Sequence, residues 1–287
     1  MEAESHLSEE VEARLDRILE ENPTVDMLKE LPPEMQMYVA VQMRYPDVVR
    51  FCATSTEAKR VCSADYFWKL KSKHDFPDEP VGPEGKRRET YKKYWEEAQA
   101  KLVECAEHGH IKCIESSLQL GIDPNIGYNK RWTALIVASS KGYIDMVRLL
   151  LKYDANTNIQ DDRGGTALIE ASRWGHADII ALLLKYDANT NIQNKRGQTA
   201  LIEASIGGHA DIIRVLLDHD ADPDIPNREG WTAIRMAARY GYVDMVRLLL
   251  NSGADSQDAL YFGLRHAGYQ GSWHRHPDIV ALLSDRS

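Results

Sequence analysis

A 33-residue period runs through the second half of the chain and limits what it can fold into. Threonine followed by alanine recurs at this interval, and the surrounding text repeats with it. The recurring residues are Thr133, Thr166, Thr199 and Thr232. At this period each unit is one small supersecondary element, which buries its apolar face only by stacking on its neighbours. The period therefore predicts a stack of repeats instead of a single globular core.

Each unit has the composition of two short helices joined by a turn. The threonine stands where an N-cap is expected, and Ala167, Leu168 and Ala171 give one first helix a thin face for close stacking. A glycine should end that helix because glycine adopts left-handed angles cheaply, and an aspartate should open the second helix. These residues are Gly142, Gly175, Gly208 and Gly241, and Asp145, Asp178, Asp211 and Asp244. A polar hairpin rich in Asn and Asp then leads onward.

The units resemble the ankyrin repeat, and the resemblance covers residues 98–287. It implies an all-α helical solenoid, with 98–126 as a divergent first unit and a closing unit that carries an insertion near 268–276. The family's Thr-Pro-Leu-His is replaced by Thr-Ala-Leu-Ile in three units and by Thr-Ala-Ile-Arg in the fourth. Without that proline some preorganisation of the helix is lost, so stability should depend more on apolar stacking.

Residues 26–76 lack the period and have an order of their own. The stretch LPPEMQMYVAVQM opens with a proline pair that favours a helix start. Met35, Val39 and Met43 follow at four-residue steps, which predicts one apolar stripe. A later proline should end this helix, and Asp47 can cap the next. Three short helices of this kind bury little surface, so the segment is expected to need a neighbour or a partner.

This segment resembles the F-box in its Leu-Pro-x-Glu start, its spaced aliphatic helix, its Asp-led second helix, its Cys-centred third helix and its terminal Trp. The resemblance implies docking on a Skp-family adaptor and, through it, on a cullin ubiquitin ligase. It assigns partner binding to Leu31, Pro32, Glu34, Met35, Val39, Met43, Asp47, Val48 and Trp68. An F-box followed by ankyrin repeats is similar to proteins of large DNA viruses of eukaryotes. The alternative is a plain N-terminal cap on the repeat stack.

These patterns divide the chain into parts with different expected roles. The parts are an N-terminal helix in 1–22, an F-box-like domain in 23–77, a linker and connecting helix in 78–97, and ankyrin repeats in 98–287. The stripe on the first helix is interpreted as a packing face. The stretch DEPVGPEG is typical of a linker.

Ankyrin stacks bind partners through their hairpin tips and the exposed side of the first helix. Carried over to this sequence, these positions are Lys130, Trp132, Arg163, Arg173, Trp174, Arg196, Arg228, Trp231, Arg239 and Tyr240. Trp, Tyr and Arg are the residue types that most often dominate interface energy. The set favours a concave protein-binding face for acidic or aromatic-complementary partners, although single basic residues can simply shield repeat edges. Single-stranded nucleic acid is a weaker alternative.

Composition excludes several other classes of function. A formal net charge of −9 argues against whole-chain binding to nucleic acid or anionic membrane. No apolar run approaches the roughly 18 residues of a membrane span, and the acidic N-terminus is unlike a secretory signal. The four cysteines are expected to be reduced. The C-x2-H-x-H-x2-C pattern at 105–113 suggests zinc, but the repeat register places its cysteines at core positions.

The sequence therefore predicts a protein without catalytic chemistry of its own. Phosphate loops, nucleophile elbows and HExxH motifs are absent, and no cofactor or metal is expected. The leading hypothesis is a substrate-recognition adaptor of a Skp–cullin–F-box ubiquitin ligase that holds an unidentified target on its ankyrin face. The alternative is a scaffold or inhibitor that binds a protein without recruiting a ligase. The expected location is the cytoplasm or nucleus of a eukaryotic cell, with a virus-infected host cell as one alternative.

Overall fold

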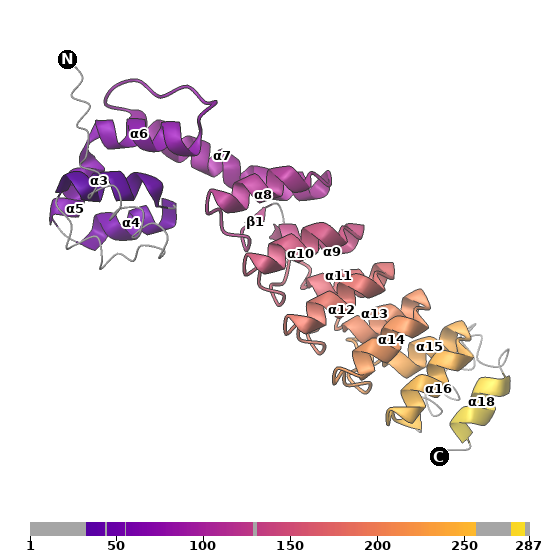
Figure 1. Cartoon of the computed structure of the whole chain (residues 1–287). Helices are drawn as coiled ribbons and strands as arrows, with labels where there is room; N and C mark the ends of the chain where they lie inside the picture. The colour runs from indigo at the N-terminus through magenta and orange to yellow at the C-terminus, as the bar shows by residue number, and fades with distance from the viewer. Residues whose placement is uncertain (1–32, 44, 55, 129–130, 257–276, 285–287) are drawn as a thin grey trace. The chain divides into compact units, whose positions relative to one another are not determined.

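The computed structural model describes residues 33–43, 45–54, 56–128, 131–256 and 277–284. Its contacts divide the chain into two compact units: unit 1 comprises 1–99 and 116–122, and unit 2 comprises 100–115 and 123–287. Apart from one short two-stranded hairpin, the regular elements of the described residues are helices, which confirms the predicted all-α class (Figure 1). The helix expected in 1–22 and the insertion near 268–276 lie outside the described residues.

Unit 1 contains a group of short helices and the start of a longer one. They are α3 (Pro33–Gln42), α4 (Tyr45–Thr54), α5 (Thr56–Ser63), α6 (Asp65–Asp75) and α7 (Arg87–Glu107). Helix α3 contacts α4, α5 and α6. The side chains of Val39, Val48, Phe51 and Phe67 are at most 1% exposed and form the core of this group. Helix α7 begins at Arg87, inside the range 78–97 that was predicted to hold a linker and a connecting helix.

A buried polar cluster ties separate segments of unit 1 together. Lys71 is 1% exposed, and its Nζ donates to the Met43 carbonyl at 2.6 Å and to Asp75 Oδ1 at 2.8 Å. The Tyr91 hydroxyl donates to Asp75 Oδ2, and His74 Nδ1 lies 2.7 Å from Asp75 Oδ1. Burial lowers the pKa of Lys71, and the Asp75 carboxylate opposes that shift. Asp75 thus connects α6 with α7, and Lys71 connects α6 with the residue that follows α3.

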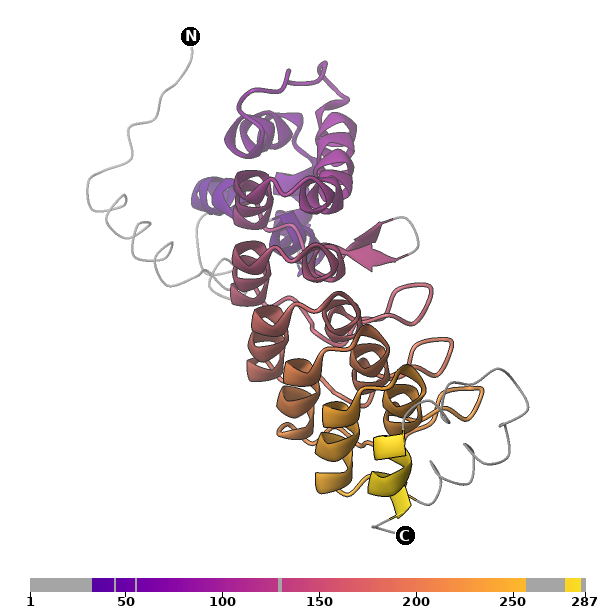
Figure 2. The same cartoon turned by 90° about the vertical axis from the view of Figure 1, so that its right-hand side faces the viewer.

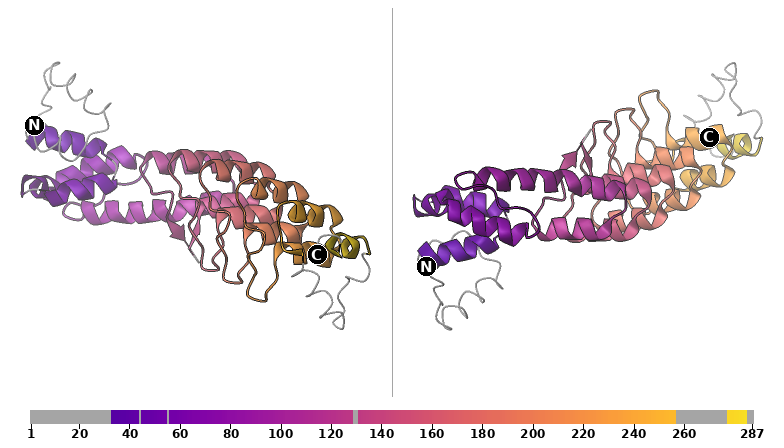
Figure 3. Two further views of the ribbon diagram at one scale, coloured as in Figure 1. Left: turned by 90° about the horizontal axis from the view of Figure 1, so that it is seen from below. Right: turned by 90° about the horizontal axis from the view of Figure 1, so that it is seen from above.

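Unit 2 is a stack of helix pairs in two layers (Figure 2). The first helices are α9 (Ala134–Lys141), α11 (Ala167–Trp174), α13 (Ala200–Gly207) and α15 (Ala233–Tyr240). The second helices are α10 (Ile144–Lys152), α12 (Ala177–Lys185), α14 (Ala210–Leu217) and α16 (Val243–Asn251). Within each layer, successive helices pack on one another. The hairpins between repeats project together on one side (Figure 3).

Further short elements lie before and after these pairs in the chain. Helix α8 (Ile111–Gln119) precedes them, followed by a hairpin in which β1 (Gly127–Tyr128) pairs antiparallel with β2 (Trp132–Thr133). Helix α18 (Pro277–Ser284) follows them and contacts α16.

The predicted helix caps are confirmed with one exception. Thr133, Thr166 and Thr199 accept the main-chain amide three residues later through their hydroxyl oxygens, at 3.2–3.3 Å. Thr232 makes no such bond, and its Oγ1 is buried without a partner. All four predicted glycines lie at the C-caps with φ between 77° and 81°. Each predicted aspartate lies in the first turn of a second helix.

Matched substitutions of Thr166 and Thr232 should lower the free energy of unfolding by different amounts, because only Thr166 caps its helix. Thr166→Ala removes a bonded cap and should lower the free energy of unfolding by about 1 kcal/mol. Thr232→Ala removes a hydroxyl that caps nothing, so it should cost only a few tenths of a kcal/mol. Urea unfolding followed by circular dichroism measures both values. Equal losses would contradict the assignment.

Polar side chains at the repeat junctions bond the main chain of the following repeat. Asn125 Oδ1 accepts the amide of Asn156 at 2.7 Å. Asn158, Asn191 and Asp224 accept in the same way from the residue 31 positions later, at 2.8–2.9 Å. The Asn/Asp-rich hairpins therefore set the spacing of successive repeats as well as turning the chain.

The four cysteines form two disulfides, so the expectation of reduced thiols is wrong. Cys52 of α4 is bonded to Cys62 of α5, and Cys105 of α7 is bonded to Cys113 of α8. The Cα atoms in these pairs are 5.8 Å and 6.1 Å apart, within the range that a disulfide spans. Each pair meets because two consecutive helices fold back on one another, which cysteine counting does not reveal.

Candidate protein-binding site

The hairpins of unit 2 share one turn geometry. Asp161 Oδ1 accepts the amides of Arg163 at 2.8 Å and Gly165 at 2.7 Å. Asn194 and Asn227 form the same two bonds in the next hairpins. Positive φ angles of 76–80° at Gly164, Gly197 and Gly230 complete the turns. The turns leave exposed side chains at the tips, in residues 162–163, 195–196 and 228–229.

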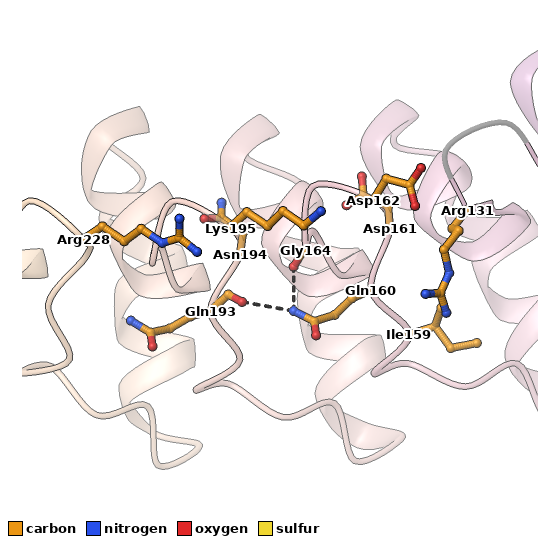
Figure 4. A pocket seen from close by; sticks show the side chains of 10 residues that line it. All are labelled: Arg131, Ile159, Gln160, Asp161, Asp162, Gly164, Gln193, Asn194, Lys195 and Arg228. Atoms are coloured by element: carbon orange, nitrogen blue, oxygen red, sulfur yellow. Dashed lines mark hydrogen bonds between the residues drawn. The ribbon is translucent and has the colours of Figure 1, made fainter.

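Successive tips are joined by hydrogen bonds. Lys195 N donates to Arg163 O at 2.8 Å, and Arg228 N donates to Arg196 O at 3.0 Å. The side chain of Gln160 adds a bond to the main chain of the next hairpin at 3.0 Å (Figure 4). The tips therefore form a connected row before any partner binds, which reduces the entropy cost of ordering them on binding.

A hollow of about 520 Å³ lies along this row (Figure 4). Arg131, Lys195 and Arg228 line it, each from a different hairpin. Within the described residues, none of these three cations forms an ion pair. Asp161 and Asp162 also line the hollow, but Asp161 is buried and its Oδ1 is occupied by the turn. The three cations, together with the exposed carboxylate of Asp162, are the charges in this hollow that remain available to a partner.

Arg173, a predicted partner-binding residue, is held by two carboxylates of the array itself. Its Nη1 lies 2.7 Å from Glu170 Oε1, and its Nη2 and Nε lie 2.8 Å and 3.2 Å from the two oxygens of Glu203. Bonding to Glu203 raises the pKa of Arg173, and burial raises the pKa of Glu170 against the opposing pull of Arg173. Arg173 therefore mainly joins α11 to α13, and its charge is already neutralised within the array.

Matched glutamine substitutions test this cluster. Because burial disfavours the charged form of Glu170, Glu170→Gln should keep or increase the free energy of unfolding at neutral pH. The raised folded-state pKa means that stability falls as pH rises from the ordinary value of 4.5 through the raised one, and Glu170→Gln should remove that fall. Glu203→Gln breaks the bidentate contact and should cost about 1–2 kcal/mol.

Urea titrations of the Glu170 and Glu203 variants between about pH 4.5 and 8 measure the free energy of unfolding and its dependence on pH. A larger loss for Glu170→Gln than for Glu203→Gln would contradict the assignment.

The predicted aromatic residues differ in how much surface they offer. Trp174 and Tyr240 are 60% and 48% exposed. Trp132 and Trp231 are half-buried, and the Arg239 guanidinium lies 4.9 Å from the centroid of the Trp231 ring. Trp174 and Tyr240 are therefore the predicted aromatics best placed to contact a partner.

The structure places the other predicted basic residues at the tips, with one addition. Arg163, Arg196 and Arg228 are exposed there, and Lys130 lies outside the described residues. Arg131 was missed, although it occupies the repeat position held by glycine in the later hairpins and has a φ of 59°. The sequence could have identified Arg131, because it is a charged residue at a repeat position that is glycine in the later units.

Of the positions predicted to face an adaptor, Val39, Met43, Val48 and Trp68 are buried inside unit 1, which corrects the prediction for these four. Val39 and Val48 are 0% exposed, Met43 is 5% and Trp68 is 3%. The Trp68 indole donates to the Cys62 carbonyl at 2.7 Å. The stripe is buried because α3 contacts α4, α5 and α6. A four-residue recurrence identifies a buried face but not the protein that covers it.

The remaining F-box-like positions are only partly described. Leu31, Pro32 and the side chains of Glu34 and Met35 lie outside the described residues. Asp47 lies in the first turn of α4, not at its N-cap, and accepts a bond from Arg50 at 3.4 Å. Val49 is 50% exposed, so it is a large apolar side chain that the described part of unit 1 presents at its surface.

The suggested zinc pattern does not come together as a ligand set. Cys105 and Cys113 are bonded to each other, and the rings of His108 and His110 stack at 5.9 Å. Across the described ranges, no three His, Cys, Asp or Glu side chains are arranged to hold a metal ion. No helix in those ranges is long and apolar enough to cross a membrane.

Stacked helix pairs with a row of exposed, connected hairpin tips define a repeat protein that binds other proteins. A family model described as ankyrin repeats (three copies) matches residues 102–194 and 184–259, which is more than half of the chain. The chain therefore belongs to the ankyrin-repeat family, and the predicted ankyrin solenoid is confirmed. Among curated proteins, no match to the chain was found.

Proposed function

We propose that this protein is a non-catalytic substrate receptor of a Skp–cullin ubiquitin ligase. Unit 2 holds a target protein, and the F-box-like unit 1 recruits the ligase. The observation that carries the proposal is the presence of two compact units of unlike architecture, one of them an ankyrin array. Such an assembly acts by proximity, because it raises the local concentration of target lysines near the ubiquitin donor.

Two features of the array support target binding. The tips are preorganised by main-chain bonds from Lys195 and Arg228 to the preceding hairpins. Trp174 and Tyr240 offer large exposed aromatic surfaces from the first helices. Residues of these types commonly anchor interfaces.

Support for ligase recruitment comes from the order of elements in unit 1. Helices α3, α4 and α5 follow the Leu-Pro-x-Glu start in the order that the F-box resemblance implies. Since Val39 and Val48 are buried, docking is proposed to use residues 31–35 and the exposed Val49. We propose action in the cytoplasm or nucleus of a eukaryotic cell.

Affinity purification of the full chain from eukaryotic cells tests recruitment. A Skp-family adaptor should be recovered with the wild type, lost with Leu31→Ala/Pro32→Ala and reduced with Val49→Asp. The control Lys59→Asp alters an exposed position on α5 and should leave recovery unchanged. Absence of the adaptor from the wild-type sample, or equal recovery with all variants, contradicts recruitment.

The burial of Val39 and Val48 favours a second candidate function. In it the array binds and masks one protein partner without recruiting a ligase, as a scaffold or inhibitor. The same purification separates the two candidates, because this one yields a target protein but no adaptor.

The proposed location also bears on the disulfides. Disulfides are rare in the cytosol and nucleus, so Cys52–Cys62 and Cys105–Cys113 have to resist a reducing compartment there. Alkylation of free thiols in the cell lysate, followed by intact-mass measurement, should leave all four cysteines unmodified.

A further inference from the structure

We propose that the row of hairpin tips in unit 2 binds an extended acidic segment of the target protein. Arg131, Lys195 and Arg228 receive carboxylates of that segment in the hollow along the tips. This inference rests on the proposed function, since it names the chemistry of the partner that the array holds.

The charge of the tips is opposite to that of the chain as a whole. The three cations of the hollow are extended along the row by Arg163 and Arg196, which are also exposed. They belong to a protein whose formal net charge is −9. A local basic row on an acidic protein attracts acidic segments.

The tip cations are available, whereas two other predicted partner-binding arginines, Arg173 and Arg239, are engaged within the array. Arg173 is bound by Glu170 and Glu203, and Arg239 lies over the Trp231 ring. Across the described ranges, Arg131, Lys195 and Arg228 have no ion pair to break before they bind a partner. The carboxylates of a target therefore gain contacts without displacing existing ones.

The arrangement of these cations favours an extended chain. They come from different hairpins, and main-chain bonds from Lys195 to Arg163 and from Arg228 to Arg196 join the hairpins of residues 161–165, 194–198 and 227–231. A single side chain or small anion meets one or two of them, whereas a segment that runs along the row reaches all of them. Because the row is already ordered, little entropy is lost in the array when the segment binds.

A peptide fits this surface better than a nucleic acid. Asp162 and Glu229 lie exposed among the tip cations and repel a continuous phosphate backbone, whereas a peptide can place neutral residues opposite them. Binding to single strands also depends on aromatic rings that stack bases. The aromatics next to the tips, Trp132 and Trp231, are half-buried, and Trp231 already contacts Arg239.

Fluorescence anisotropy with the full chain tests this directly. The probes are a labelled peptide of about twelve alternating Glu and Ser residues, the matching Lys/Ser peptide, and a single-stranded DNA of similar length. The Glu/Ser peptide should bind, and Arg131→Glu/Lys195→Glu/Arg228→Glu should weaken it by at least about tenfold. The matched control Arg148→Glu/Lys185→Glu/Arg214→Glu changes the net charge equally, on exposed positions of the second helices, and should weaken binding less than about threefold.

Circular dichroism melting checks that both triple variants fold. If the reversed tip variant does not, Arg131→Gln/Lys195→Gln/Arg228→Gln replaces it, with a smaller expected loss of affinity in the same direction. No binding of the Glu/Ser peptide, equal weakening by both triple variants, or tighter binding of the DNA overturns the proposal. Adaptor recovery through unit 1 is measured separately, so failure here with the adaptor retained counts against the acidic segment and not against the receptor function.

Discussion

Replacing Asp75 by alanine is expected to destabilise unit 1 by about 3–5 kcal/mol and to unfold it while the repeat array stays folded. The carboxylate receives Lys71, Tyr91 and His74, so its removal leaves the buried Lys71 ammonium with the Met43 carbonyl alone. An ammonium without a counter-charge in an apolar environment is strongly unfavourable. Hydrogen exchange read by mass spectrometry resolves peptides of the two units and measures the effect.

The matched control is Asp78→Ala, which removes an exposed aspartate three residues later. It should change the free energy of unfolding by less than about 0.5 kcal/mol. If Asp75→Ala leaves exchange in unit 1 at the wild-type rate, the polar cluster is not a stabilising element.

Gly197→Ala is expected to lower the free energy of unfolding of the array by about 3 kcal/mol and to disturb the row of tips. An L residue at a φ of +77° is strained by roughly 1–2 kcal/mol. Its Cβ would also lie 2.6 Å from Arg228 N and 2.9 Å from Asn227 Cα, so the next hairpin must move. That movement stretches the bond from Arg228 N to Arg196 O. Urea unfolding and exchange of the Arg228 amide measure both consequences.

Gly230→Ala is the control for crowding. Its φ is +80°, but the nearest atom to the added Cβ is Arg235 Nη1, the end of a flexible side chain, at 3.7 Å. Only the backbone strain of about 1 kcal/mol should then appear. Equal losses for Gly197→Ala and Gly230→Ala would show that close approach of the hairpins contributes nothing.

Features that depend on a few consecutive residues were predictable from the sequence. The C-cap glycines such as Gly175 and first-turn aspartates such as Asp178 have local causes, and all of them were confirmed. The exception among the caps is Thr232, whose unit has Arg235 where the other units have isoleucine. The Arg235 guanidinium donates to the Gly230 carbonyl of the hairpin. Nothing in the structure explains why the Thr232 hydroxyl itself stays unbonded.

Features that depend on distant residues were not predictable in this way. The Arg173 and Glu203 side chains meet across 30 residues, and only the stacking of α11 on α13 brings them together. Val39 was correctly placed on an apolar face of α3, but the cover comes from this chain's own helices. Periodicity shows that a face is buried, and it carries no information about what buries it.

The Asx turns leave the tip side chains without structural duties. In each hairpin the Asp or Asn and the glycine define the turn, and the bonds between hairpins come from main-chain amides and from the Gln160 and Gln193 side chains, not from the side chains at the tips. The outward residues 162–163, 195–196 and 228–229 can therefore accept almost any amino acid except proline while the repeats stay stacked. A library randomised at those six codons would sample new binding preferences on an unchanged scaffold, and natural divergence has the same freedom to switch targets.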